Sequence, residues 1–382
     1  MKNNLSQLEK KAVSLHRRFK GKLQTTSLLR LRNKKDLSLV YTPGVAAISS
    51  LIAENKKEVC DLTWKNRSVA VISDGSAVLG LGNVGPEAAL PVMEGKCVIF
   101  KEFANIDAVP IVLNTQDTKE IIKIVKAIAP GFGAINLEDI SAPRCFEIEN
   151  RLKEELDIPV MHDDQHGTAI VVLAGLINAL RVVKKRLPKA RIIVNGAGPA
   201  GTATAKLLVK AGAKNVVVLD SKGIIYKGRK DLVPHKKELA EITNPKHLTG
   251  DLNRAIWEAD VFIGLSRPNL LMPNHIKMMS RPAIVFALAN PVPEIMPNLA
   301  WKAGAKVVAT GRSDFSNQIN NSLVFPGIFR GALDNRVSRI TDEMKLRAAF
   351  TLARLIKKPT PKNIIPSIFD KRVVKAIAKT IR

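Results

Sequence analysis

The chain has 382 residues, of which 46% are hydrophobic and 25% are charged. These values are those of a soluble globular protein long enough for two domains, and they exclude a disordered or fibrous chain. The formal net charge is +26, from 60 basic and 34 acidic residues. Because the basic residues are dispersed and only 4% of residues are aromatic, we predict no nucleic-acid partner.

Cysteine usage and hydropathy indicate the cellular compartment. Cys60, Cys97 and Cys145 form no CxxC pair and no metal-ligand spacing, so we expect small apolar side chains in a reducing compartment. The first residues lack the apolar core of a signal peptide. The longest apolar stretch, residues 168–180, contains Asn178 and is too short to span a bilayer. We therefore predict a cytoplasmic protein with no membrane partner.

The first half of the chain changes its pattern at Ser68. Residues 1–40 are basic and predicted to be helical, and a second helical pattern covers residues 46–58. After Ser68, short apolar runs alternate with helical segments, which predicts a parallel sheet whose site is built at the carboxyl ends of its strands. The predicted strands are residues 69–72, 97–100, 109–113, 134–137 and 158–161, and the predicted helices begin at the Asp117 capping box and cover residues 142–156 and 169–185.

Two of these strands are followed by acidic pairs. Glu138 and Asp139 follow one strand, and Asp163 and Asp164 follow the next. Parallel neighbours joined by one helix would bring both pairs together, and converging carboxylates suit Mg²⁺ or Mn²⁺. The alternative, weighted equally, is that these acids only cap the following helices. The nearby histidines at 162 and 166 are more often structural than a zinc site.

A glycine-rich turn gives the strongest local signal. An apolar strand at 191–195 runs into the turn, a helix follows to residue 211, and a strand at 216–219 ends in Asp220. This order predicts a dinucleotide site, with the pyrophosphate at the helix N-terminus and Asp220 on the ribose 2′-hydroxyl. Asp220 favours NAD, whereas Lys222 could accept the 2′-phosphate of NADP. The predicted cofactor-binding turn consists of Gly196, Ala197, Gly198, Pro199, Ala200 and Gly201.

A second glycine run, residues 80–85, has the same spacing without the same context. The segment after it contains Pro86, Pro91 and Gly95, and we predict no clean helix there. We interpret the run either as a tight backbone passage near the substrate site or as purely structural.

The remaining strands are predicted at residues 261–263, 283–287 and 306–309. The second is followed by Asn290, a candidate for both cofactor and substrate contact. Beyond the third lie Gln318, Asn320 and Asn321, amides that can bind substrate or simply form turns. Residues 330–357 are predicted to be helical, and the basic, apolar tail to Arg382 could close the first domain.

The sequence thus predicts an α/β protein with two domains. The first is an α/β substrate and metal domain, residues 1–160, completed by residues 322–382. The second is a doubly wound parallel Rossmann domain, residues 161–321.

Several motifs, taken together, resemble those of the bacterial malic enzymes. They are YTPGVA at 41–46, MEGKC at 93–97, LEDI at 137–140, HDDQHGTA at 162–169 and GRSD at 311–314, with Asn320 and Asn321 following. The resemblance runs from about residue 10 to the end of the chain. It implies oxidative decarboxylation of L-malate to pyruvate and CO₂, reduction of NAD or NADP, and a bound Mg²⁺ or Mn²⁺.

The resemblance also implies roles for single residues. Lys96 corresponds to the general base that takes the proton of the C2 hydroxyl, with Asp163 beside it. Tyr41 corresponds to the acid that protonates the enolate. Asn290 and Asn321 would hold a substrate carboxylate. The metal ligands would be Glu138, Asp139 and Asp164, and we expect a homodimer or higher homo-oligomer.

The sequence departs from the family in three respects. Larger malic enzymes carry an arginine where this chain has residues 74–79, hybrid forms add a phosphotransacetylase-like domain, and the chain ends earlier than typical members. Two alternatives stay open. One is malolactic conversion of malate to lactate, and the other is a degenerate chain that binds nucleotide or nucleic acid without turnover.

Overall fold

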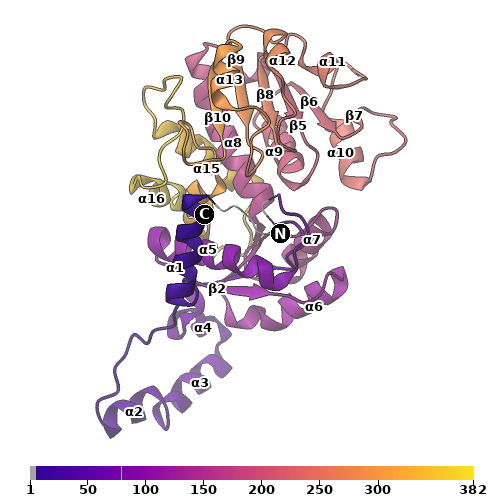
Figure 1. The fold of residues 1–382 in the computed structure, drawn as a ribbon. Helices are drawn as coiled ribbons and strands as arrows, with labels where there is room; N and C mark the ends of the chain where they lie inside the picture. Colours follow the sequence, from indigo (N-terminus) through magenta and orange to yellow (C-terminus); the bar gives the residue numbers. More distant parts are fainter. Residues whose placement is uncertain (1–5, 79) are drawn as a thin grey trace.

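Two separate β-sheets organise the chain in the computed structural model, which describes residues 6–78 and 80–382 (Figure 1). The first sheet has the strand order β2-β1-β3-β4, and its strands pair in parallel. β1 is fully buried because its apolar residues are covered on both faces. The strands are β1 (Ser68–Ser73), β2 (Asp107–Val112), β3 (Ala134–Leu137) and β4 (Val160–His162).

The second sheet has the order β10-β9-β8-β5-β6-β7. Its first five strands are parallel, and the short β7 pairs antiparallel with β6 across a two-residue turn. The order changes direction between β5 and β8, which creates the crevice where doubly wound folds bind ligands. The strands are β5 (Arg191–Asn195), β6 (Asn215–Asp220), β7 (Gly223–Ile224), β8 (Val261–Gly264), β9 (Ala283–Ala287) and β10 (Ala305–Thr310).

Amphipathic helices cover both sheets. Asp117 caps α6 through a hydrogen bond from the Glu120 amide, but the predicted capping box is incomplete because the Glu120 carboxylate accepts from the hydroxyl of Thr115. The helices of the first sheet are α4 (Val59–Leu62), α5 (Pro86–Ala104), α6 (Thr118–Ile128) and α7 (Arg144–Glu155), with the short 3₁₀ turns η1 (Lys56–Glu58), η2 (Trp64–Arg67) and η3 (Ala129–Gly131). Those of the second are α9 (Pro199–Lys210), α10 (Pro234–Ile242), α11 (Leu252–Ile256), α12 (Pro273–Lys277) and α13 (Pro297–Lys302), with η4 (Leu187–Lys189) before β5.

The long helix α8 (Asp163–Val182) follows β4 directly and carries the chain from the first sheet toward the second (Figure 1). It begins six residues before the predicted start. Most of its residues are buried. Gly167 lies close to Asn321, because an added Cβ would come 3.0 Å from that residue's Cβ. Gly175 similarly lies against Phe286 of β9 and Ile319, which follows β10. Glycines thus let α8 approach both neighbours closely.

The C-terminal helices pack on α5 of the first sheet and on the connecting helix α8. They are α14 (Phe325–Asp334), preceded by η5 (Asn321–Leu323), then α15 (Asp342–Arg354) and α16 (Arg372–Ala378). The ring of Phe100 on α5 lies 4.7 Å from that of Phe325 and 5.3 Å from that of Phe329, both edge-on. Such aromatic contacts add to the stabilisation from burial.

The N-terminal arm, residues 6–54, contrasts with the rest of the chain. Its helices α1 (Gln7–Phe19), α2 (Lys34–Val40) and α3 (Gly44–Glu54) contain no buried residue. Figure 1 shows α2 and α3 projecting from the body beyond α4. The arm nevertheless exposes many large apolar side chains, among them Leu28, Leu29, Leu31, Leu37, Leu39 and Leu51.

Within residues 6–78 and 80–382, two segments have the length and mean hydropathy of a membrane-spanning helix. One is α8, whose apolar window is 72% buried inside the fold, so it is a core helix. The other, Lys34–Glu54, is not one continuous helix, because α2 ends at Val40 and α3 starts at Gly44.

Most predicted strands are present, and the one at residues 97–100 is wrong. These residues belong to α5, which also refutes the prediction that no clean helix follows the second glycine run. Pro86 occupies the first turn of α5, where its missing amide costs no hydrogen bond. The predicted helix at residues 1–40 divides into α1 and α2 around a non-helical stretch, and its first five residues lie outside the described part of the chain.

Candidate active site

Lys96 lies within α5 at the centre of a buried group of carboxylates. Its Nζ forms a short hydrogen bond and ion pair with Asp163 and lies 2.9 Å from Oε1 of Glu138. The ring centroid of Phe325 lies 4.4 Å from the same nitrogen. Because β3 and β4 are parallel neighbours, their carboxyl ends bring Glu138 and Asp163 to one lysine.

Three carboxylates beside this lysine have the composition of a divalent-cation site. One oxygen each from Glu138, Asp139 and Asp164 lies within 4.8 Å of the other two. Asp164 also accepts a hydrogen bond from the backbone nitrogen of Asp139 at 2.9 Å. Hard oxygens at this spacing fit Mg²⁺ or Mn²⁺. The structure therefore brings the two acidic loops together, while their role as metal ligands stays a prediction.

The electrostatics of the cluster favour an added positive charge. Burial lowers the pKa of Lys96, but the negative charges of Asp163, Glu138 and Asp164 outweigh burial and raise this pKa above its ordinary value. Burial, followed by the charge of Asp164, raises the pKa of Glu138 well above its ordinary value. Burial also raises the pKa of Asp163. One ammonium therefore balances only part of the negative charge of the four carboxylates, and a divalent cation would balance two further charges.

A cavity of about 690 Å³ joins this cluster to the second sheet. Its lining includes Lys96 and the three carboxylates from the first sheet's side. From the second it includes Pro199 and Ala200 of the glycine turn, together with Asn290, Asn320 and Asn321. The predicted base, the predicted metal ligands, part of the glycine turn and the three asparagines thus meet around one space, although they come from distant segments.

The second glycine run borders this cavity. Gly80 lines it, has a φ of +74°, and an added Cβ would lie 2.4 Å from the carbonyl oxygen of Asn290. Such a clash with backbone excludes a side chain here. The geometry is that of a tight backbone passage beside the candidate site, which is the first of the two interpretations given to the run.

The cofactor-type glycine turn lies at the crevice between β5 and β8. Gly196 has a φ of +125°, and a Cβ there would lie 2.4 Å from the carbonyl oxygen of Leu265. A Cβ on Gly201 would lie 1.8 Å from the carbonyl oxygen of Gly196, so only glycine lets α9 start directly above the turn. A cavity of about 1610 Å³ is lined by residues 196–198 and Asp220.

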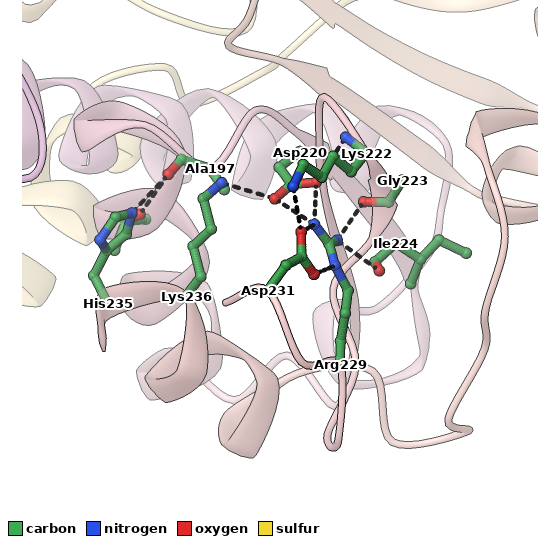
Figure 2. A network of polar contacts seen from close by, with 10 residues as sticks. Ala197, Asp220, Lys222, Gly223, Ile224, Arg229, Asp231, His235 and Lys236 are labelled. Carbon is green, nitrogen blue, oxygen red and sulfur yellow. Dashed lines mark hydrogen bonds and ion pairs between the residues drawn. The ribbon is translucent and has the colours of Figure 1, made fainter. Parts of the chain in front are cut away.

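The carboxylate of Asp220 already has four hydrogen bonds from the chain (Figure 2). Its Oδ1 accepts from the backbone nitrogen of Lys222 and from Nη2 of Arg229, both at 2.9 Å. Its Oδ2 accepts from Arg229 at 2.8 Å and from Lys236 at 2.7 Å. A carboxylate has about four lone-pair positions, so a ribose hydroxyl would have to replace one of these donors.

Two residues predicted from the family motifs need separate comment. Tyr41 lies at the C-cap of α2, is 65% exposed, and lines neither described cavity. The structure therefore does not bring it to Lys96 of the same chain. Among the described residues, the carboxylate group includes neither histidine. His166 instead lies 2.9 Å from a carboxylate oxygen of Glu149, whereas Nδ1 of His162 lies 3.9 Å from Oδ2 of Asp164.

Sequence reasoning missed several residues of these cavities. Arg229 and Lys236 surround Asp220, Ser266 lines both cavities, and Phe325 packs on Lys96. Each of these residues contacts a segment that is distant in the sequence. None belongs to a local motif from which its place in a cavity could have been predicted.

The glycine turn lies at the switch point of a doubly wound sheet and faces a lysine and three converging carboxylates. This arrangement is typical of dinucleotide-binding enzymes that also bind a divalent cation through carboxylates. The family model described as malic enzyme, N-terminal domain matches residues 20–153, and the one described as malic enzyme, NAD binding domain matches residues 165–381. The chain belongs to the malic enzyme family.

Individual relatives agree with this assignment. The chain is 54% identical to the NAD-dependent malic enzyme of Geobacillus stearothermophilus, over 94% of this chain and 76% of that protein. It is 52% identical to the bifunctional malic/malolactic enzyme of Bacillus subtilis, over 98% of this chain and 92% of that protein. The crystal structure of the NAD-dependent malic enzyme from Thermotoga maritima superimposes with a TM-score of 0.94 at 50% identity, over 97% and 98% of the two chains. The predicted family and two-part α/β fold are confirmed.

Proposed function

We propose that this chain oxidises and decarboxylates L-malate to pyruvate and CO₂ in the cavity between its two sheets, with Lys96 as general base. The observation that carries this proposal is the contact of Lys96 with Asp163 and Glu138, on a cavity that also reaches the glycine turn. Oxidation of malate needs a base for the C2 hydroxyl proton and a nicotinamide that accepts the hydride from C2. The lysine and the cofactor-type turn border the same cavity, so both groups could act on one substrate.

The residues divide the chemistry between them. Lys96 accepts the proton of the C2 hydroxyl, and Asp163 holds the ammonium in place. Glu138, Asp139 and Asp164 hold the divalent cation, which when bound would stabilise negative charge on the C2 oxygen as a Lewis acid. Asn290, Asn320 and Asn321 donate amide hydrogens to a malate carboxylate.

The cofactor is NAD(P), and we propose NAD as the preferred form. Burial raises the pKa of Asp220, but hydrogen bonds from Lys236, the Lys222 amide and Arg229 outweigh it and lower this pKa. The carboxylate is therefore ionised at neutral pH. A 2′-phosphate would meet this negative charge and compete with it for the same cations.

We propose that Tyr41 acts in the active site of a second copy of the chain. Leu28, Leu31 and Leu39 on the same arm are more than half exposed, and a stable monomer rarely leaves so large an apolar surface uncovered. An arm that packs on a partner would bury these leucines and carry Tyr41 away from its own Lys96. A two-fold symmetric homodimer would exchange both arms.

The division of the chain into residues 1–160 with 322–382, and 161–321, is likewise a proposal. It is supported by the contacts of Phe325 and Phe329 with Phe100, which attach α14 to α5 of the first sheet. The fold and the bacterial relatives support a soluble protein, and a cytoplasmic location is the finer proposal.

The bifunctional relative of Bacillus subtilis favours malolactic conversion as a second candidate. In that reaction the pyruvate is reduced to lactate before the cofactor leaves. Purified protein with malate, Mn²⁺ and NAD separates the two functions. We expect the near-ultraviolet absorbance of reduced nicotinamide to rise with pyruvate in equal amounts. Lactate without net cofactor reduction would replace the first function with the second.

A further inference from the structure

Glu149 is a buried carboxylate that the reaction does not use. It lies on α7, and its side chain is 2% exposed. Burial raises the pKa of Glu149, but the charges of His166 and Lys153 and the hydrogen bond from His166 outweigh it and lower this pKa well below its ordinary value. Neighbouring carboxylates on α7, such as Glu155, lie at the surface.

Glu149 pairs with Lys153 of its own helix, whose Nζ lies 2.6 Å from its Oε1, and its other contacts converge on one turn of another helix. Its Oε1 accepts a hydrogen bond from the backbone nitrogen of His162 at 2.9 Å. Its Oε2 accepts one from Nε2 of Gln165 at 3.2 Å, and Nε2 of His166 also lies 2.9 Å from the carboxylate. His162 is the N-cap of α8 and makes no side-chain cap of its own. Glu149 therefore attaches to this turn at three points from outside the helix.

The three attachment points enclose two residues of the active site. Asp163 and Asp164 lie between His162 and Gln165 in sequence, so the turn cannot move without moving both carboxylates. Asp163 contacts Lys96, and Asp164 belongs to the carboxylate group. A shift of a few tenths of an ångström would alter both arrangements, because cation coordination and proton transfer depend on close geometry.

We propose that Glu149 is a positioning residue of the active site, which fixes the first turn of α8 and thereby the carboxylates of Asp163 and Asp164. It touches neither substrate nor cation. This inference rests on the proposed function, since it assumes that the carboxylate group holds Mn²⁺. It adds a residue outside the cavity to those that the reaction requires.

The test compares Glu149→Gln with Glu155→Gln. Both residues lie on α7, and Glu155 is paired with Lys126 and Arg151 away from α8. Glutamine keeps the size of glutamate but has one acceptor oxygen, so it cannot receive both the His162 amide and the donors of Gln165 and His166. Free Mn²⁺ is titrated by electron paramagnetic resonance, and NADH binding is followed by fluorescence.

We expect Glu149→Gln to weaken Mn²⁺ binding about tenfold or more, as loss of a group that orients a metal ligand typically does. NADH affinity and the KM for NAD should stay within about twofold, because the glycine turn makes no contact with Glu149. Turnover at saturating Mn²⁺ should also fall, since Asp163 shifts against Lys96. Glu155→Gln should leave all of these values unchanged.

Each other outcome contradicts a defined part of the argument. If the unmodified protein binds no Mn²⁺, the proposed metal site fails and the inference with it. If the unmodified protein binds Mn²⁺ and folded Glu149→Gln binds it equally well, only the positioning role fails. Equal losses of Mn²⁺ and NADH affinity, or a similar loss in Glu155→Gln, would indicate a general loss of stability. Either result would overturn the positioning role of Glu149.

A second variant covers the case in which Glu149→Gln does not fold. Gln165→Met keeps the length of the side chain and removes one donor to Glu149 while the carboxylate remains. We expect Mn²⁺ affinity several-fold lower than in the unmodified protein with unchanged NADH affinity. Unchanged Mn²⁺ affinity in folded Gln165→Met overturns the positioning role.

Discussion

Lys96 illustrates how burial and charge compete at a single residue. A general base must lose its proton at the working pH, yet the carboxylates around Lys96 raise its pKa above the ordinary value. The same carboxylates are those proposed to hold the divalent cation, whose charge would offset theirs. The lysine and the cation group are therefore parts of one electrostatic unit, and the removal of either affects the other.

Replacement of Lys96 by alanine should lower turnover of malate by about 10²- to 10⁴-fold, the usual contribution of a general base. NADH should still bind with unchanged affinity, because the glycine turn lies on the second sheet. Steady-state rates and a fluorescence titration measure the two effects. Lys101→Ala is a matched control on α5, since Lys101 is exposed and pairs with Asp107. Near-normal turnover of Lys96→Ala would refute its role as base.

The cysteines allow a second prediction from single residues. Burial raises the pKa of the Cys97 thiol, and of the Cys145 thiol, from 9.0 to about 12. The thiolate is the reactive form, so both should be alkylated about a thousandfold more slowly than an ordinary thiol at mildly alkaline pH. Cys60 is partly exposed. Iodoacetamide and mass spectrometry of the native protein should find label on Cys60 first, and early label on Cys97 would contradict this prediction.

Local motifs predicted those site residues whose neighbours follow from the order and direction of the strands. Glu138 and Asp164 could be placed together because parallel strands end at one edge. The partners of Asp220 could not, because Arg229 and Lys236 reach it from a loop and from α10. The position of Tyr41 could not be predicted either, since a family motif gives a residue's role and not the course of the segment that carries it.

At the scale of elements, α5 shows why local breakers misled the prediction. Pro91 and Gly95 suggested an interrupted segment, yet the helix continues because one face is buried at helical spacing, through Ala89, Met93 and Cys97. Burial of that face outweighs the cost of a proline and a glycine within the helix. The helix in turn places Lys96 beside β3 and β4.

Asp220 at the end of β6 is the proposed determinant of the choice between NAD and NADP. Asp220→Asn removes the negative charge and releases Lys236 and Arg229 to bind a phosphate. We expect kcat/KM with NADP to rise relative to that with NAD by about tenfold or more. Parallel assays with the two cofactors measure this ratio. Asp231→Asn is the control, since Asp231 also pairs with Arg229 but leaves Asp220 in place. An unchanged ratio in Asp220→Asn would exclude Asp220 as the determinant.

At the scale of the whole molecule, the proposed exchange of arms in a homodimer would account for both the exposed arm and the distant Tyr41. Each active site would then take Lys96 from one chain and Tyr41 from its partner. A dimer of Lys96→Ala and Tyr41→Phe chains would contain one site with both defects and one site with neither. If Tyr41 acted in its own chain, both sites would contain one defect.

Co-expression of these two chains with different affinity tags, and purification through both tags, isolates the hybrid dimer. We expect each parent homodimer to be nearly inactive and the hybrid to recover about half the activity of the unmodified dimer, because one of its two sites is complete. A hybrid of two Lys96→Ala chains with different tags controls for effects of the tags and should stay inactive. An inactive mixed hybrid would place Tyr41 in its own chain's site, and the apolar surface of the arm would then need another partner.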